Sequence, residues 1–592
     1  MQKTNYTSQR IFIFLVILAS AFSQRSLYAQ QKDVPYVAKP WVPKVWTSEI
    51  PANCPFTTST DIKAIAFTGK HISYTDADTW YPSWASDDNM YSGWTDGEIG
   101  LENSQSSGGA RAVTGNAKII GDDPLNLKII SLGTERASAL PYAGRYPCAN
   151  LVYNGIWYYG TYGIDFDPKP ENQKYSWAIC GPLPGFRISK DYGKTWADCP
   201  FSLDNPLFPE SGKNGQQVKM GTPHFVDFGK NLENSPDGKA YLVGHGAIDN
   251  DPSPRVANNS WISGDAVYMA RVKPSLETMN DISSYEFFAG DDVNGNAIWS
   301  GNFSDIKPVM QWNNHMGCVN ITYNKPLKKY IMCVTDGWPG IENMNSYIME
   351  ADKITGPYRL ITYMKDFGTQ GYFVTIPSKF ISEDGKTAWL SYSANFSQKY
   401  FRDRTRENPI GSRYAWNLQE IQLLDNKEEV ETNKAYSIGQ PDPVKNDKNL
   451  ALRASVTVSS ALRKARPFTE LIEYFGEGAT DGIVDPQSKN KLAEWVSDGE
   501  KNTAFLRLTW KTPQEVSRVW LFDRPDLKNQ ITSGMLVFSD GSSVKISALP
   551  NDASSAKEIQ FPAKKITWLA LIVNSVSQTT SNAGLAEIAV FK

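Results

Sequence analysis

The sequence predicts an all-β protein with two domains, a β-propeller followed by a jelly-roll β-sandwich. Aromatic residues make up 12% of the 592 residues and fall in short runs separated by Gly, Pro, Asn and Asp, which is typical of many strands joined by tight turns. One turn motif recurs along the first two thirds of the chain. A charged segment then separates these strands from a second set, and a chain of this length exceeds one ordinary core.

The recurring turn motif predicts the blades of the propeller. Ser189–Trp196 reads S-x-D-x-G-x-T-W, and looser copies begin at Ser86, Ser235 and Ser382. In such a turn, Asp and Gly form the tight bend and the hydroxyls bond its backbone. Successive copies are 103, 46 and 147 residues apart, which fits multiples of about 45–50 residues, the size of a four-stranded blade. Residues 45–424 are therefore expected to form five to seven blades, with five favoured because several loops look long.

The second set of strands predicts a separate domain. Residues 425–450 are charged, contain proline and are poor in aliphatic side chains, as expected of a linker. Residues 451–592 then show alternating runs such as Leu506–Trp510 and Ile566–Leu571. This pattern predicts a compact sandwich that folds without the propeller.

The N-terminal residues predict export. Lys3 and Arg10 precede the apolar run Ile11–Phe22, and the residues up to Ala29 have the small-residue spacing of a cleavage site. Residues 1–29 are therefore expected to be a signal peptide cleaved near Ala29, with the mature protein in the periplasm or outside the cell. The apolar run is too short to span a membrane, so membrane insertion is not expected.

Net charge and composition limit the classes of partner and cofactor that the protein is expected to bind. A net charge of −3 leaves no electrostatic footprint for nucleic acid, and a monomer that binds carbohydrate is expected. The chain has four histidines, too few to suggest a multi-histidine metal centre, and no cofactor is expected for catalysis. Six cysteines permit disulfides in an oxidising compartment. Cys180 with Cys199 and Cys318 with Cys333 each bracket a plausible hairpin; buried free thiols are an equal alternative.

Two resemblances follow from particular stretches. The carrying residues in the C-terminal domain are Ala479–Asp485, Glu494–Trp495, Val516–Phe522, Ser539–Gly541 and Gly584–Ile588. This domain resembles the discoidin-type (coagulation factor 5/8 C-type) sandwich, which implies a carbohydrate-binding module. The resemblance also makes Asp481 and Asp485 candidate neighbours of a structural calcium ion.

The propeller resembles the sialidase-like Asp-box proteins over Ser189–Trp196. Its broader similarity is to a group of secreted bacterial propellers that includes endo-D-arabinanases. That similarity is carried by Asp78–Tyr91 with Trp94–Gly97, Tyr285–Gly290 with Ile298–Trp299, and Tyr323–Tyr330. No arginine triad for a carboxylate sugar can be picked out, so sialic acid is not the expected substrate.

The densest chemical signal is a group of acidic residues: Asp76, Asp78, Asp87, Asp88, Asp96 and Glu98. Glycoside hydrolysis requires two carboxyls across a scissile bond, one protonated and one charged. Asp78 and Asp96 lie 18 residues apart and can sit at the ends of successive strands joined through the turn that follows Ser86. We expect this pair to be catalytic; the alternative is that both are turn or cap residues.

Histidines offer a rival chemistry. His224, His245 and His315 lie among polar residues or glycines. With Arg145 and Tyr153, His224 or His315 could supply the acid, base and cation of a lyase that acts on a uronate polysaccharide. A metal held by His and Asp could instead serve an esterase.

Aromatic side chains near the acidic group are candidates for a sugar-binding platform, with core packing as the alternative. They are Trp80, Trp84 and Trp94. The function expected first is therefore an exported glycoside hydrolase with an accessory carbohydrate-binding module. The alternatives are a polysaccharide lyase and a non-catalytic glycan-binding protein.

Overall fold

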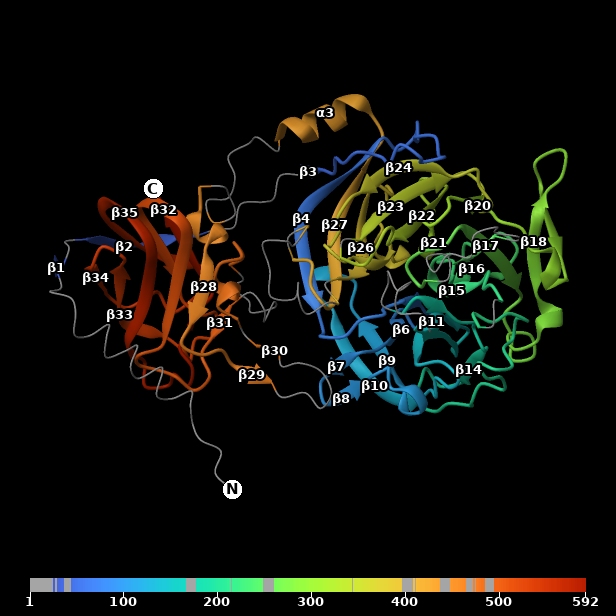
Figure 1. Ribbon diagram of the computed structural model, residues 1–592, viewed down its shortest axis with the longest axis horizontal. Coiled ribbons are helices and arrows are strands. Elements are labelled where there is room, and N and C mark those ends of the chain that lie inside the picture. Colours follow the sequence, from blue (N-terminus) through green and yellow to red (C-terminus); the bar gives the residue numbers. More distant parts are fainter. Residues whose placement is uncertain are drawn as a thin grey trace, which may run out of the picture. The chain divides into compact units, whose positions relative to one another are not determined.

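The computed structural model describes residues 25–26, 29–36, 44–166, 177–213, 216–248, 260–342, 344–394, 396, 408–409, 411–436, 444, 448–464, 472–473, 475–484 and 494–592. The chain forms two compact units (Figure 1). One comprises Trp41–Gly439 with Pro467–Thr469, and the other combines Met1–Pro40, Gln440–Arg466 and Glu470–Lys592.

The first unit is a five-bladed β-propeller, as predicted (Figure 1). Blade 1 consists of β5 (Ser83–Trp84), β6 (Met90–Trp94), β9 (Val113–Ile120) and β10 (Lys128–Arg136), and blade 2 of β11 (Gly144–Tyr153), β12 (Ile156–Asp165), β13 (Ile179–Cys180) and β14 (Phe186–Ser189). Blade 3 consists of β15 (Gly221–Phe225), β16 (Ala240–Gly246), β17 (Ala266–Val272), β18 (Glu286–Asp291), β19 (Ala297–Ser300) and β20 (Met310–Gln311). Blade 4 consists of β21 (Gly317–Asn324), β22 (Lys329–Asp336), β23 (Asn345–Ala351) and β24 (Arg359–Met364).

Blade 5 closes the ring with strands from both ends of the propeller sequence. Its inner strands are β25 (Tyr372–Thr375), β26 (Thr387–Ser393) and β27 (Trp416–Leu424), and its outer strands are β4 (Ala64–Tyr74) and β3 (Lys44–Val45). The β27–β4 ladder runs from Trp416 opposite Tyr74 to Leu424 opposite Ala64. Hydrogen bonds between segments about 350 residues apart in sequence therefore complete the propeller.

The innermost strands share a bulge that turns the backbone near the axis. Register shifts lie between Cys148 and Asn150, Gly221 and His224, Gly317 and Asn320, and Tyr372 and Thr375. Each shift holds a non-glycine residue with positive φ: Ala149, Thr222, Cys318 and Phe373. Thr79, at a φ of 64°, occupies the corresponding place ahead of β5. Because such backbone is strained, its repetition marks this end of the inner strands as a built feature.

The recurring turns predicted the correct number of blades, but the blade length inferred from their spacing was wrong. The turns at Ser86, Ser235 and Ser382 all join the first and second strands of a blade, in blades 1, 3 and 5. Intervals of 149 and 147 residues therefore each span two blades, and a blade occupies about 74 residues rather than 45–50. The complete copy at Ser189 begins at the end of β14 in blade 2, not between the first two strands of a blade, so its distance of 46 residues to the next copy is not a blade repeat.

The second unit is built on an eight-stranded sheet and is consistent with the predicted sandwich. Its strands are β1 (Arg25–Ser26), β2 (Gln30–Pro35), β28 (Ser455–Val458), β32 (Phe505–Phe522), β33 (Ile531–Phe538), β34 (Ser542–Ile546), β35 (Ser555–Val576) and β37 (Glu587–Phe591). Long β32 and β35 bury alternate aliphatic residues around Trp495.

The sandwich extends beyond the predicted range of 451–592. Strand β2 pairs antiparallel with β35, from Gln30 opposite Gln560 to Pro35 opposite Ser555. Tyr36 follows β2 and packs edge-on against Phe522, with ring centroids 5.1 Å apart. Strand β1 lies within the expected signal peptide, whose first 24 residues fall outside the described part of the chain.

The structure also bears on the predicted linker and on the predicted disulfides. Lys427–Tyr436, within the predicted linker, forms helix α3, and Val430 packs beside Val45, Ala66 and Leu424 of the propeller. All six cysteines are described and all are free thiols, so the alternative to the two disulfides is the one observed. Among the described residues, no helix has the length and apolar character needed to span a membrane.

Candidate functional site

The structure brings Asp78 and Asp96 together at one end of blade 1. The backbones of Asp78 and Thr95 exchange two hydrogen bonds, of 2.9 and 3.0 Å, which places Asp96 next to this bridge. Gly97 permits the close crossing, because a Cβ there would lie 1.9 Å from the carbonyl oxygen of Asp76. The two carboxyls therefore share one site, although neither lies in a regular strand.

Asp78 is buried, with 7% of its surface exposed, and both of its carboxyl oxygens accept hydrogen bonds. Thr79 donates to Oδ1 at 2.9 Å and Tyr372 donates to Oδ2 at 2.7 Å. Asp96 is only half-buried, and Ser106 N–H donates to its Oδ1 at 2.7 Å. Thr95 Oγ1 also donates to Oδ1 of Asp96, at 3.3 Å.

Both carboxyls hold protons more tightly than usual. Burial, followed by the charge of Asp96, raises the pKa of Asp78 to about 8. Burial raises the pKa of Asp96 to about 6, against hydrogen bonds from Ser106 and Thr95 that lower it. Near pH 7 the pair therefore contains one protonated and one ionised carboxyl, with Asp78 the protonated member.

Tyrosines from two other blades complete the surroundings. Tyr372 from β25 bonds Asp78, and Tyr414 donates to the carbonyl oxygen of Asp96 at 2.7 Å. Tyr146 from β11 is buried, and the charges of Asp96 and Asp78 raise its pKa further, after burial itself. Sequence reasoning missed Tyr372 and Tyr414, because residues up to 318 positions away meet the pair only through ring closure.

Of the histidines near the axis, neither His224 nor His245 is suited to acid–base work. His224 is 2% exposed and packs against Tyr81 at 4.1 Å, and burial lowers its pKa to about 3. His245 Nδ1 contacts Thr222 Oγ1 at 2.9 Å and Nε2 contacts the Ser260 carbonyl at 3.0 Å, and burial lowers its pKa to about 4. Both are therefore neutral rings in the propeller interior.

His315 has a more functional environment. Its Nδ1 lies 2.7 Å from Oδ2 of Asp336, a buried carboxyl that also accepts a hydrogen bond from Tyr363 at 2.8 Å. The ring stacks on Trp312 at 4.1 Å, and Nε2 lies 3.5 Å from Asn53 Nδ2. This His–Asp pair belongs to blade 4, and in the part of the chain that the structure describes it forms no hydrogen bond with Asp78 or Asp96.

The predicted aromatic platform does not form around the pair. Trp80 and Trp94 are fully buried, and Trp80 stacks on Trp416 at 5.3 Å, so both are core residues. Trp84 lies at the β5–β6 turn, where its indole N–H donates to Asp88. That turn is at the far end of the innermost segment from Asp78.

Arg145 and Tyr153, predicted to serve one lyase site, lie at the start and the end of β11. Eight residues of strand separate them by about 26 Å, so they cannot share a substrate sugar. Arg145 lies at the same end of the propeller as Asp78, where it lines a cavity with Arg136 and Arg187. The structure thus gathers three arginines that the sequence did not connect, between two blades rather than on the axis.

Glu210 is a buried carboxyl that sequence reasoning did not single out. It is 7% exposed, and burial raises its pKa to about 7. Its oxygens accept hydrogen bonds from the backbone N–H groups of Lys219 (2.8 Å) and Met220 (3.2 Å), just ahead of β15. This bonding assigns Glu210 to holding the loop in place.

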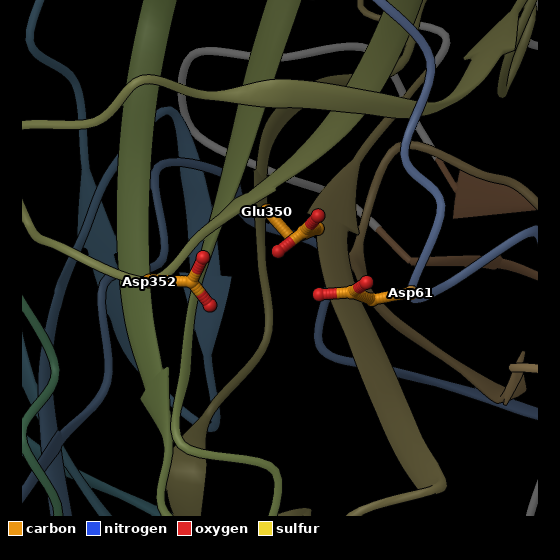
Figure 2. A group of neighbouring side chains, drawn as sticks. All are labelled: Asp61, Glu350 and Asp352. Atoms are coloured by element: carbon orange, nitrogen blue, oxygen red, sulfur yellow. The ribbon is translucent and has the colours of Figure 1, made fainter.

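A second acidic group serves structure. Asp61, Glu350 and Asp352 converge on the outer part of blade 4 with their ligand atoms within 4.8 Å of one another (Figure 2). Lys329 pairs with all three, and Arg359 bonds Glu350 at 2.8 Å. Because these cations neutralise the carboxylates, and the Lys329 contact lowers the pKa of Asp61 and Asp352, the group ties the segment ahead of β4 to blade 4.

The calcium expected in the sandwich stays a prediction. Asp481 is buried and its Oδ1 accepts a hydrogen bond from Ile483 N–H at 2.8 Å. Asp485 lies outside the described residues.

Comparison with known proteins adds the following. Residues 449–591 match a family described as a domain of unknown function, DUF7402. No curated protein matches the chain significantly. A solved glycoside hydrolase aligns with 88% of this chain and 98% of its own, at 12% identity and a TM-score of 0.33.

Two smaller solved structures align with the sandwich-sized part. The lectin domain of lectinolysin, complexed with Lewis B antigen, covers 25% of this chain and 98% of its own at 17% identity and a TM-score of 0.20. A carbohydrate-binding module from Clostridium perfringens in complex with GalNAc-β-1,3-galactose covers 24% and 97% at 21% identity and a TM-score of 0.19. All these TM-scores lie below 0.5, so what this chain does has to be argued from its own side chains.

Proposed function

We propose that the propeller is a glycoside hydrolase that uses Asp78 and Asp96, and that the sandwich is its carbohydrate-binding module. The observation that carries this proposal is the coupled carboxyl pair, with one buried and one half-buried member and both pKa values raised. Glycoside hydrolysis needs this combination of a proton donor and a charged partner near neutral pH.

In this proposal the two carboxyls take different roles. Asp78, protonated at neutral pH, gives its proton to the leaving oxygen of the glycosidic bond. Asp96, the less buried member, acts on the anomeric carbon as nucleophile or through a water as base. Tyr372 stays hydrogen-bonded to Asp78 and holds the acid in position.

The test replaces each carboxyl by its amide and assays a polysaccharide panel for new reducing ends. Asp78→Asn and Asp96→Asn each should lower turnover by about 10²–10⁴-fold with folding intact. Wild-type activity should follow a bell-shaped pH profile, rising as Asp96 ionises near pH 6 and falling as Asp78 ionises near pH 8. Near-full activity in both variants would refute the proposal.

The His315–Asp336 pair supports a second candidate, a lyase or esterase. A histidine oriented by a buried carboxylate is a common acid–base arrangement. Lyase action would give an unsaturated product that absorbs ultraviolet light, and hydrolysis would not. Loss of activity in His315→Ala, with both aspartate variants active, would favour this candidate, whereas glycan binding without any product would indicate a non-catalytic protein.

A further inference from the structure

A polar cavity of about 280 Å³ lies between blades 1 and 2, apart from the carboxyl pair. Strands β10, β11, β12 and β14 and the loop at Asp198 contribute to its wall, and β9 and β10 run beside blade 2 in Figure 1. Three of its lining residues are the arginines Arg136, Arg145 and Arg187, against a single lining carboxylate, Asp198.

Arg187 is a buried cation that forms no ion pair within 4.0 Å in the described part of the chain, although the charges of Glu135 and Asp198 act on it. It is 8% exposed, and its guanidinium lies 3.8 Å from the ring centroid of Tyr159 and 4.7 Å from that of Trp196. Its Nη1 and Nη2 donate to neutral oxygens of Thr114 (3.0 Å) and Asn116 (2.6 Å) of blade 1. Its Nε is buried and has no hydrogen-bond acceptor among the described residues.

Arg145 repeats this pattern on the opposite wall. Its Nε donates to Thr161 Oγ1 at 2.7 Å and its Nη1 to the Ser138 carbonyl at 3.2 Å, and no described carboxylate lies within ion-pair distance. Burial lowers the pKa of both arginines, because the surroundings disfavour their charge. Buried charges are normally paired, so the buried guanidinium of Arg187 and the half-buried one of Arg145 leave more positive charge at the cavity than its one lining carboxylate, Asp198, balances.

We propose that this cavity binds an oxyanion, the carboxylate or sulfate ester of an acidic sugar. A guanidinium presents its donors in a planar fork that matches such groups, and Nε of Arg187 provides an unused donor. The volume is close to the lower end for small-molecule pockets and accommodates about one sugar unit.

Backbone hydrogen bonds connect Arg145, in the wall of the cavity, to Asp96 of the carboxyl pair. Arg145 N–H donates to the Ser106 carbonyl at 3.0 Å, and Ser106 N–H donates to Asp96 Oδ1 at 2.7 Å. These two bonds link the backbone of the cavity wall to the carboxyl pair, although neither Asp78 nor Asp96 lines the cavity. The proposal that the anion is part of a glycan rests on the proposed function. The proposal that the cavity binds an oxyanion does not depend on it.

The test titrates the full-length protein with sodium glucuronate, galactose 6-sulfate and sodium sulfate, using calorimetry and melting temperature at constant ionic strength set with chloride. Glucose is the neutral control. Wild type should bind at least one acidic sugar saturably, and Arg145→Met and Arg187→Lys should each weaken that affinity at least tenfold. Arg271→Met is the matched control, since Arg271 also stacks on a tryptophan, Trp299, at 4.0 Å but is already paired with Glu286.

The outcomes separate the alternatives. Lack of saturable binding by all three anions, or unchanged affinity in Arg145→Met, overturns the site. Binding of inorganic sulfate alone overturns the assignment to an acidic sugar. Because the titration needs no turnover, either failure leaves the hydrolase proposal standing, and loss of turnover in Asp78→Asn with anion binding intact would show the two sites to be independent.

Discussion

Asp78→Asn should make the stability of the propeller less sensitive to pH. In the unfolded chain Asp78 loses its proton near pH 4, whereas in the folded protein it keeps the proton up to about pH 8. Between these values the unfolded state binds fewer protons, so wild-type stability falls as pH rises. The amide does not titrate, and the variant lacks this contribution.

The size of this effect on stability follows from the pH range over which only the folded state keeps the Asp78 proton. Each pH unit in this range lowers the free energy of unfolding by about 1.4 kcal/mol, so the two units from pH 5 to pH 7 lower it by about 2.7 kcal/mol. With an unfolding entropy of about 2.1 cal/mol/K per residue over roughly 380 residues, this corresponds to a loss of about 3 °C in Tm. Asp96 faces a neutral neighbour in both proteins over this range, so its own titration cancels from the comparison.

The assay is scanning calorimetry of wild type and Asp78→Asn at pH 5 and pH 7. Wild type should lose about 3 °C more than the variant. Asp292→Asn is the matched control, because this exposed turn aspartate has a lowered pKa and should follow wild type over the whole range. Equal losses in wild type and Asp78→Asn would mean that Asp78 is ionised in the folded protein, and its role as the acid would fail.

Three further predictions address other parts of the molecule. Tyr36→Ala should destabilise the sandwich by about 3 kcal/mol, because it removes a buried aromatic ring, while the exposed Gln30→Ala should not; an unchanged sandwich melt in both would show that the β2 segment contributes nothing. Unfolded protein without reductant should show six reactive thiols, with Cys54 and Cys199 reacting first in the native state, whereas two disulfides would leave only two. Glu210→Gln should retain turnover, because the amide oxygen still accepts a backbone N–H; a loss of orders of magnitude would make Glu210 the acid.

The sequence was informative where local patterns determine the structure. Alternating strands and recurrent turns predicted an all-β propeller, and the short interval between Asp78 and Asp96 placed both in one supersecondary unit, where the structure finds them adjacent. Their catalytic role stays a prediction. Blade length was wrong because similar turns occur at different places in different blades, and a tight turn needs only its own residues.

What the sequence did not reveal depends on long-range contacts. Tyr372 and Tyr414 reach the pair from blade 5, and no local pattern predicts which blades become neighbours. Trp80 was expected near sugar because it lies beside Asp78 in sequence, but the bulge at Thr79 precedes it and its indole ring lies in the core. Arg187 lies two residues ahead of the turn motif Ser189–Trp196 and was overlooked, because no local pattern predicts that it shares a cavity with Arg136 and Arg145.

The capture of β2 by the C-terminal sheet has a consequence for the order in which the protein matures. The propeller sequence is an insertion between the N-terminal strands of the sandwich, β1 and β2, and the rest of it, so β2 meets its partner, β35, only when synthesis is almost finished. Until then the edge of β35 that receives β2 stays open, and exposed strand edges invite pairing between molecules. After a single protease cut that follows the propeller sequence, β2 would stay covalently joined to the propeller, and the C-terminal strands would be held to β2 only by the hydrogen bonds between β2 and β35.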